Sequence, residues 1–116
     1  MELTTNAIGA SAEGDAIAAL TAAGYQVLER NYRCSIGELD VIARDGDTLV
    51  FIEVRSRSVD VFGHAAEMVT RRKQRRVARV AQAYLQDRRP AFEACRFDVV
   101  ARTSGRIDVI KDAWRL

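Results

Sequence analysis

Two carboxylates, Asp40 and Glu53, lie on either side of an Asp45-Gly46 pair, which is a strong signal for the turn of a β-hairpin. If Asp45 and Gly46 are the two loop residues, side-chain alternation places both carboxylates on one face of the hairpin, as diagonal neighbours. A four-residue loop would pair them directly on one face, whereas a three-residue loop or a bulge would separate them. The spacing therefore favours two acidic groups that face each other across paired strands.

The two faces of this predicted hairpin differ in chemistry. Like charges on neighbouring strands repel, so a stable hairpin needs a reason to hold the carboxylates together. A hard divalent cation, Mg²⁺ or Mn²⁺, is one reason, because carboxylate oxygens are its preferred ligands. The alternative is that Arg55 and other basic residues neutralise the pair. On the favoured register the core face carries Leu39, Val41, Val50, Ile52 and Val54, and the acidic face carries Glu38, Asp40, Glu53 and Arg55.

A third carboxylate, Glu13, lies in a predicted first helix. The residues three, four and seven positions after it lie on the same side of a helix, and they are Ala16, Ile17 and Leu20. These residues are apolar, so Glu13 is expected to point toward the packed side of the helix, where a carboxylate needs a partner. The alternative is that Glu13 lies in an early turn and interacts favourably with the helix dipole. Position alone leaves both interpretations open.

A basic segment, residues 71–89, holds eight Lys or Arg residues against one acidic residue, Asp87. The segment therefore has a charge of +7, and because the whole chain is +2, the remainder is −5. A one-sided basic stripe on an otherwise acidic protein is the electrostatic footprint of a polyanion-binding surface. The alternative is an ordinary solvated helix face. The residues expected to contact a nucleic-acid backbone are Arg57, Arg71, Arg72, Lys73, Arg75 and Arg76.

Within this segment Lys73 has a special position, because it lies four residues after Val69 and four before Val77 and so shares their apolar face. A lysine there can bury its stem and keep its amine in water. The sharper alternative is that the amine reaches the rim of the carboxylate site.

The elements that must position these groups follow from the apolar periodicity and the turn signals. A helix is predicted over residues 6–23, before Gly24, and a second helix over residues 65–86 after a loop that contains His64. Strands are predicted over residues 25–32, 36–44, 48–57, 95–102 and 106–111. This order predicts an α/β fold with a mixed sheet and helices packed on it.

Length and composition limit the class of protein. The 116 residues predict one domain, residues 1–116. No apolar run approaches the roughly 20 residues that cross a bilayer, and residues 1–10 lack the basic start and apolar stretch of a signal peptide. The two cysteines, Cys34 and Cys95, are expected to be free thiols. A cytoplasmic protein without a membrane partner is therefore expected.

Several stretches resemble the PD-(D/E)xK nuclease superfamily and, more closely, the YraN family of uncharacterised bacterial proteins, which is related to archaeal Holliday-junction resolvases. The resemblance implies a restriction-endonuclease-like three-layer core, and it assigns the metal site to Glu13, Asp40, Glu53 and the backbone carbonyl of Val54, with Arg55 at the basic catalytic position. The similar stretches are residues 9–20, G-Y-Q-V-L-E-R-N-Y-R, G-E-L-D-V-I-A, F-I-E-V-R-S-R, Phe62-Gly63, V-T-R-R-K and R-F-D-V-V-A.

The chain departs from this superfamily at Arg55, where a lysine is usual. A lysine amine can shift its pKa and help to deprotonate water, whereas a guanidinium stays protonated and can only stabilise charge. The resemblance implies a nuclease that uses Mg²⁺ or Mn²⁺ to hydrolyse phosphodiester bonds of DNA, including branched DNA, or RNA, with DNA favoured. The first rival is a nucleic-acid-binding module that keeps the scaffold but does not cut. The second is a protein that forms a homodimer and binds an acidic protein through its basic helix.

Overall fold

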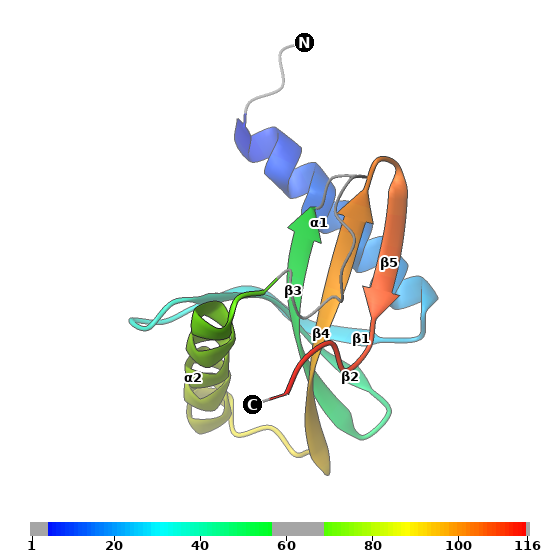
Figure 1. Cartoon of the computed structure of the whole chain (residues 1–116). Coiled ribbons are helices and arrows are strands. Elements are labelled where there is room, and N and C mark those ends of the chain that lie inside the picture. Colours follow the sequence, from blue (N-terminus) through cyan, green and yellow to red (C-terminus); the bar gives the residue numbers. More distant parts are fainter. Residues whose placement is uncertain (1–4, 57–68, 116) are drawn as a thin grey trace.

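Five strands lie side by side in chain order and form one mixed sheet (Figure 1). The computed structural model describes residues 5–56 and 69–115, and the side chains only from residue 13 onward. The neighbouring strands are antiparallel except for β3 and β4, which are parallel. The elements are α1 (Thr5–Ala22), β1 (Gln26–Arg33), β2 (Glu38–Asp45), β3 (Thr48–Ser56), α2 (Arg71–Arg88), β4 (Ala94–Thr103) and β5 (Arg106–Ile110).

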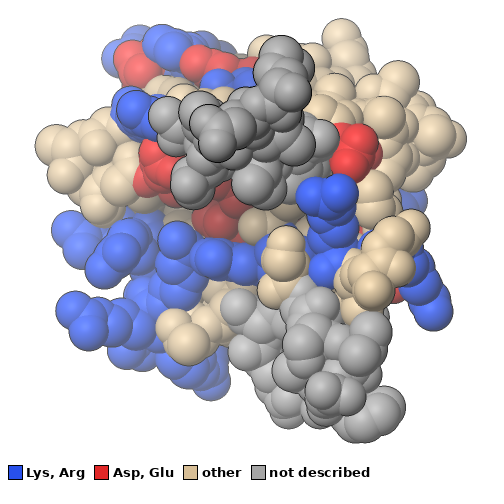
Figure 2. All heavy atoms as spheres, turned by 90° about the horizontal axis from the view of Figure 1, so that it is seen from above, with Lys and Arg blue, Asp and Glu red and all other residues tan. Residues whose placement is uncertain are grey.

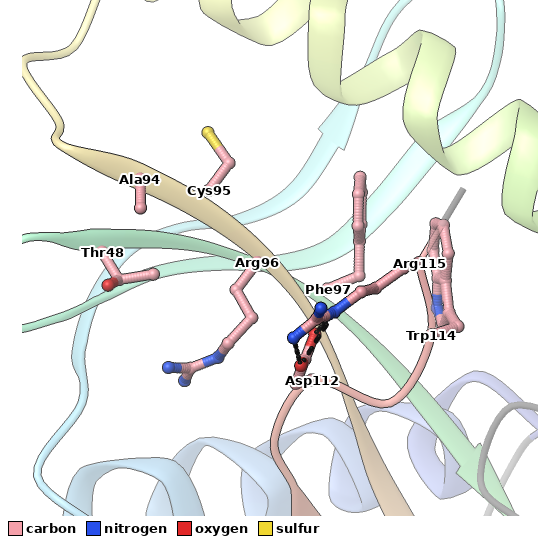
Figure 3. A pocket seen from close by; sticks show the side chains of 8 residues that line it. All are labelled: Thr48, Ala94, Cys95, Arg96, Phe97, Asp112, Trp114 and Arg115. Carbon is pink, nitrogen blue, oxygen red and sulfur yellow. Dashed lines mark hydrogen bonds and ion pairs between the residues drawn. The ribbon is translucent and has the colours of Figure 1, made fainter.

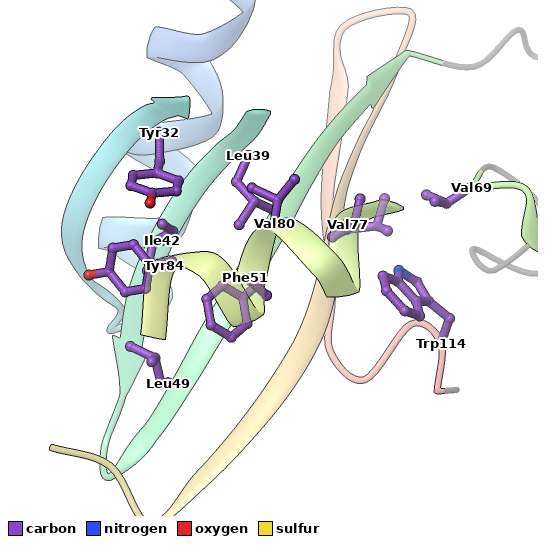
Figure 4. Packing of buried hydrophobic residues seen from close by; sticks show 12 residues of the cluster. Tyr32, Leu39, Ile42, Leu49, Phe51, Val69, Val77, Val80, Tyr84 and Trp114 are labelled. Carbon is purple, nitrogen blue, oxygen red and sulfur yellow. The ribbon is translucent and has the colours of Figure 1, made fainter. Parts of the chain in front are cut away.

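The two helices cover opposite faces of the sheet, so the central strands are buried on both sides (Figure 1). On the α2 face, Val80 and Tyr84 pack near Phe51 of β3 (Figure 4). On the α1 face, Leu20 packs in the cluster that includes Ile52. Parallel strands need a crossover connection, and α2 lies in the connection between β3 and β4. The predicted mixed α/β sheet flanked by helices is confirmed, and it is consistent with a restriction-endonuclease-like core.

The second helix begins later than predicted. It starts at Arg71 rather than at residue 65, and the predicted residues 65–68 lie outside the described part of the chain. Thr70 is the N-cap, because its hydroxyl oxygen accepts a hydrogen bond from the backbone N–H of Lys73 at 3.1 Å. The helix ends at Arg89, which adopts a left-handed conformation, with φ of 47°. The first turn contains no acidic residue and three basic ones, although the helix dipole is positive at this end.

The β2–β3 hairpin has a different turn from the one predicted. Asp45 pairs with Thr48, so the loop residues are Gly46 and Asp47 rather than Asp45 and Gly46. Gly46 has a φ of 63°, as the first central residue of a type II′ turn requires. The register is therefore the alternative one considered above, in which the carboxylates are directly opposite, and the favoured diagonal register is wrong.

Leu39 also departs from the predicted alternation. It was expected on the face of Val41, but it packs in the α2-side cluster, whereas Val41 packs in the α1-side cluster. Leu39 lies beyond the last reported β2–β3 pair, Val41 with Ile52, but it is paired in the β1–β2 ladder with Tyr32, which belongs to the same cluster.

A buried polar network holds the end of the sheet near the β2–β3 turn. Asp98 is fully buried and accepts hydrogen bonds from the Tyr25 hydroxyl at 2.5 Å and from Arg96 Nε at 2.8 Å. Arg96 Nη2 also donates to Asp45 Oδ2 at 2.8 Å, and this bond holds the pKa of Asp45 below its ordinary value. The backbone N–H of Asp112 donates to Asp98 Oδ1 at 2.9 Å. The network therefore joins Tyr25, directly before β1, with β2, β4 and the chain after β5. None of the described helices is long and apolar enough to cross a membrane.

Replacing Asp98 with Ala should lower the free energy of unfolding by about 3–5 kcal/mol, because Arg96 keeps its charge in a mostly buried position and loses its main partner. Urea unfolding measures this change. The matched control is Arg106→Ala, which removes a solvent-exposed ion pair with Asp108 and should change the free energy by no more than about 0.5 kcal/mol. Equal losses in both variants would contradict a structural role for the network.

Candidate functional site

The hairpin register brings two of the predicted site carboxylates together. The reported pairs end at Val41 and Ile52, and continuing that register by one residue places Asp40 opposite Glu53. The backbone N–H of Val54 donates to Asp40 Oδ2 at 2.8 Å, so the Asp40 side chain lies against the β3 backbone at the predicted site. The predicted proximity of Asp40, Glu53 and Val54 thus has a direct geometric basis.

Glu53 is almost completely buried, with 3% of its surface exposed, and lies on the α2 side of β3 by alternation from Phe51. Its Oε1 atom is buried and has no hydrogen-bond partner among the described residues. Burial, followed by the negative charge of Asp40, raises the pKa of Glu53 to about 8, although Lys73 and Arg55 act in the opposite direction. A buried carboxylate oxygen without a hydrogen-bond partner lowers the stability of the folded state. Stability alone therefore does not explain a glutamate at this position.

Arg55 gives the pair only partial compensation. Its Nη2 atom lies 3.6 Å from Glu53 Oε2, and its side chain is 32% exposed. Its Nε atom is buried and has no partner among the described residues. Arg55 therefore forms the expected ion pair with Glu53. One oxygen of Glu53 and one nitrogen of Arg55 still have no hydrogen-bond partner among the described residues.

Lys73 is half-buried in the first turn of α2. Its positive charge lowers the pKa of Glu53, so the amine is close enough to the carboxylate to stabilise its ionised form. Whether the amine reaches the rim of the site or extends into water stays a prediction.

Glu13 is not joined to this arrangement by any contact among the described residues. It is on α1, which covers the face of the sheet opposite α2. Its Oε2 atom accepts a hydrogen bond from Asn31 Nδ2 of β1 at 3.2 Å. Among the described residues, no group of three or more His, Cys, Asp or Glu side chains is placed to hold a metal ion. The structure thus joins Asp40 and Glu53 and leaves Glu13 with a partner of its own.

The predicted basic surface forms on α2. Figure 2 shows Lys and Arg side chains gathered in one area at the lower left of the view, with acidic side chains beside them toward the centre. A Cβ at Gly37 would lie 3.4 Å from Arg76 Cδ and from Val80 Cγ2, so the loop between β1 and β2 lies directly against α2. Arg57 lies outside the described residues. The exposed arginines of α2 are Arg71, Arg72, Arg75 and Arg76, which were predicted as contacts, and Arg79 and Arg88, which were not.

A cavity of about 330 Å³ lies elsewhere, beside the first half of β4 (Figure 3). None of the predicted site residues lines it. Its acidic residue, Asp112, is paired with Arg115, and its aromatic wall is Phe97 stacked on Trp114 with ring centroids 4.0 Å apart. The acidic and aromatic groups of the cavity are thus already engaged with one another, and the carboxylate pair remains the stronger candidate site.

The raised pKa of Glu53 predicts a pH-dependent stability in EDTA. Between about pH 4.5 and pH 8 the folded state keeps a proton that the unfolded state releases, so the free energy of unfolding falls as the pH rises, by at most about 1.4 kcal/mol per unit. Glu53→Gln should remove this contribution, as measured by urea unfolding at several pH values. Glu38→Gln, at a side chain that is 50% exposed, should keep the wild-type slope. The assignment fails if Glu53→Gln keeps it too.

Comparison with known sequences gives the relationship of this chain. It matches the sequence model of "Uncharacterised protein family UPF0102" over residues 12–101. A UPF0102 protein of Moorella thermoacetica is 46% identical over 121 residues, covering 98% of this chain and 100% of the relative. Relatives from Syntrophus aciditrophicus and Cupriavidus pinatubonensis are 48% and 50% identical, over 93% and 97% of this chain and 88% and 89% of their own lengths. None of these names states an activity. The chain belongs to the uncharacterised protein family UPF0102, and the matched region contains all three predicted site carboxylates.

Proposed function

We propose that this protein is a divalent-metal-dependent nuclease of the PD-(D/E)xK type, similar to the YraN family, which binds nucleic acid and hydrolyses its phosphodiester bonds. One observation carries the proposal. Two carboxylates, Asp40 and Glu53, lie side by side, and Glu53 has a buried oxygen without a hydrogen-bond partner among the described residues. The first turn of α2, which packs on the same face of the sheet as Phe51, is basic. An acidic pair suits a cation, and the adjacent arginines suit the polyanion on which that cation would act.

The residues present fit Mg²⁺ or Mn²⁺. Asp40 and Glu53 offer hard oxygen donors, and Glu53 Oε1 lacks any other described partner. Mg²⁺ is commonly held by one or two carboxylates and completes its shell with water and substrate phosphate, so two close carboxylates are sufficient. The backbone carbonyl of Val54 is a further oxygen beside Asp40. When bound, the cation would supply Lewis-acid stabilisation of charge on the phosphate and lower the pKa of a bound water.

The remaining site residues would position the substrate. The Arg55 guanidinium, which stays protonated, would bind a phosphate oxygen next to Glu53. Lys73 would bind a second phosphate oxygen as a point charge, since its amine already acts on Glu53. The exposed arginines of α2 would hold the flanking backbone through contacts that do not depend on base sequence. DNA is favoured over RNA as the substrate.

A second candidate function is a binding module that does not cut. Arg55 is the observation that favours it, because a guanidinium cannot take a proton from water as the usual lysine can. Conversely, a module that does not hydrolyse nucleic acid has no evident need for a buried acidic pair that lowers the stability of the fold.

Metal binding should be visible without substrate. Mn²⁺ should raise the melting temperature of the wild-type chain, since a ligand that binds only the folded state stabilises it. Asp40→Asn and Glu53→Gln should each abolish the shift, because both variants keep the shape of the side chain and lose a donor charge. Glu38→Gln is the matched control and should shift as the wild type does. A shift of equal size in all four proteins would place the cation elsewhere.

Binding to duplex DNA in EDTA should weaken steeply with salt, because contacts between basic residues and phosphates release counterions. The double variant Arg72→Ala, Arg76→Ala should reduce the slope of log K against log salt by roughly one unit per lost contact. The control, Arg106→Ala with Arg115→Ala, removes the same charge from exposed positions outside α2 and should keep the slope. If the two double variants behave alike, α2 does not carry the interface.

Cleavage separates the two candidate functions. Purified wild-type protein is incubated with branched, duplex and single-stranded DNA, and with RNA, in Mg²⁺, Mn²⁺ or EDTA. The proposal expects cleavage that EDTA and Glu53→Gln both abolish, and faster cleavage by Arg55→Lys, because an amine can assist proton transfer. Tight binding without cleavage, in the wild type and in Arg55→Lys alike, would identify the binding module.

A further inference from the structure

Another cavity lies on α2, further along the helix than the basic first turn. It has a volume of about 190 Å³ and lies between the helix and the loop that joins β1 to β2. Ile36 lines it from the loop, and the helix contributes residues spaced three or four positions apart, which share one face of a helix. The helix residues that line the cavity are Arg79, Gln82, Ala83 and Gln86.

The loop side of this cavity is held against the helix. The backbone N–H of Cys34 donates to the carbonyl oxygen of Gly37 at 2.9 Å, which closes the loop. A Cβ at Gly37 would lie 3.4 Å from Val80 Cγ2, and Ile36 packs against the buried cluster that contains Val80. The cavity therefore lies between two elements whose relative position is held by packing.

The cavity continues the exposed basic face of α2. Arg72, Arg79 and Gln86 are all exposed and are spaced seven positions apart, so they lie along one face of the helix. The rise from Arg72 to Gln86 is about 21 Å at 1.5 Å per residue. Beyond Arg79 the exposed positions of this face are the glutamines Gln82 and Gln86. A nucleic-acid backbone bound along the arginines would thus reach the cavity at Arg79.

The side chains that line the cavity suit a nucleobase better than a phosphate. A glutamine amide carries donors and an acceptor but no charge, so Gln82 and Gln86 can pair with the edge of a base. The Arg79 guanidinium can stack on the plane of a base, and Ile36 and Ala83 offer apolar contact. Among the described residues, none of the three polar side chains has a hydrogen bond or an ion pair, so their donors and acceptors are available to a ligand.

We infer that this cavity binds one unpaired nucleobase of a nucleic acid whose backbone lies along α2. The inference rests on the proposed nucleic-acid function. In a perfect duplex each base is stacked and paired, and a base that is already unpaired leaves the stack at the least cost. The preferred substrate class is therefore nucleic acid that carries an unpaired nucleotide beside the basic face of α2.

The test is a measurement of Kd by fluorescence anisotropy in EDTA, with the whole chain and three DNA duplexes of one sequence. The first is perfectly paired, the second has one extra unpaired nucleotide, and in the third that extra nucleotide is abasic. The wild type is expected to bind the second duplex about 10-fold more tightly than the other two. The double variant Gln82→Ala, Gln86→Ala should lose this preference and keep the wild-type affinity for the perfect duplex, because it changes no charge and alanine favours the helix.

Gln26→Ala is the matched control, because it removes the same amide from an exposed position on β1. It should keep the preference. Equal binding of the first two duplexes by the wild type, or a preference that persists in the double variant, would overturn this inference alone. An equal gain from the abasic nucleotide would assign the preference to the flexibility of the DNA and would overturn it too. A wild-type protein that binds none of the three duplexes would overturn the proposed function and this inference with it.

Discussion

The register of the β2–β3 hairpin determines the rest of the site, because it forces two acidic side chains to face each other. The two-residue turn at Gly46 and Asp47 fixes that register, and the hydrogen bond from the Val54 N–H to Asp40 holds one carboxylate against β3. Glu53 is held away from water, with 3% of its surface exposed. Its raised pKa and its unpartnered oxygen follow from these two facts. The site is thus built around a pair of carboxyl groups in which Glu53 keeps its proton up to about pH 8.

The buried acidic residues at the two ends of the sheet differ in how completely they are paired. Near the hairpin turn, Asp98 is buried but fully paired, with Arg96, Tyr25 and a backbone N–H as donors. At the other end, Glu53 is buried and only partly paired. The paired network around Asp98 stabilises the fold, whereas the incompletely paired Glu53 lowers its stability. Among the described residues, these incompletely paired polar groups and the basic first turn of α2 are the observations on which the proposed cation and nucleic-acid site rests.

Much of this could be predicted from the sequence, and the failures have physical causes. Periodicity located both helices and all five strands, and alternation located the acidic face. The exact register could not be predicted, because Gly46 can occupy either central position of a two-residue turn and only the type II′ choice puts it first. The start of α2 depends on the N-cap at Thr70. The helix was predicted to begin before this residue, because the apolar pattern continues toward the N-terminus. The link between Asn31 and Glu13 is long-range, and its only local signal is an asparagine inside a predicted strand.

The parallel pairing of β3 with β4 has a consequence for the order of folding. Asp40 and Glu53 come from strands joined by a two-residue turn, so they can meet as soon as one local hairpin forms. Pairing β3 with β4 instead joins residues such as Thr48 and Ala94, which are more than forty positions apart, and closes a long loop that contains α2. Local contacts form faster than distant ones because they close shorter loops. The acidic pair is thus expected to form within a local hairpin, before the β3–β4 pairing and the packing of α2 complete the fold.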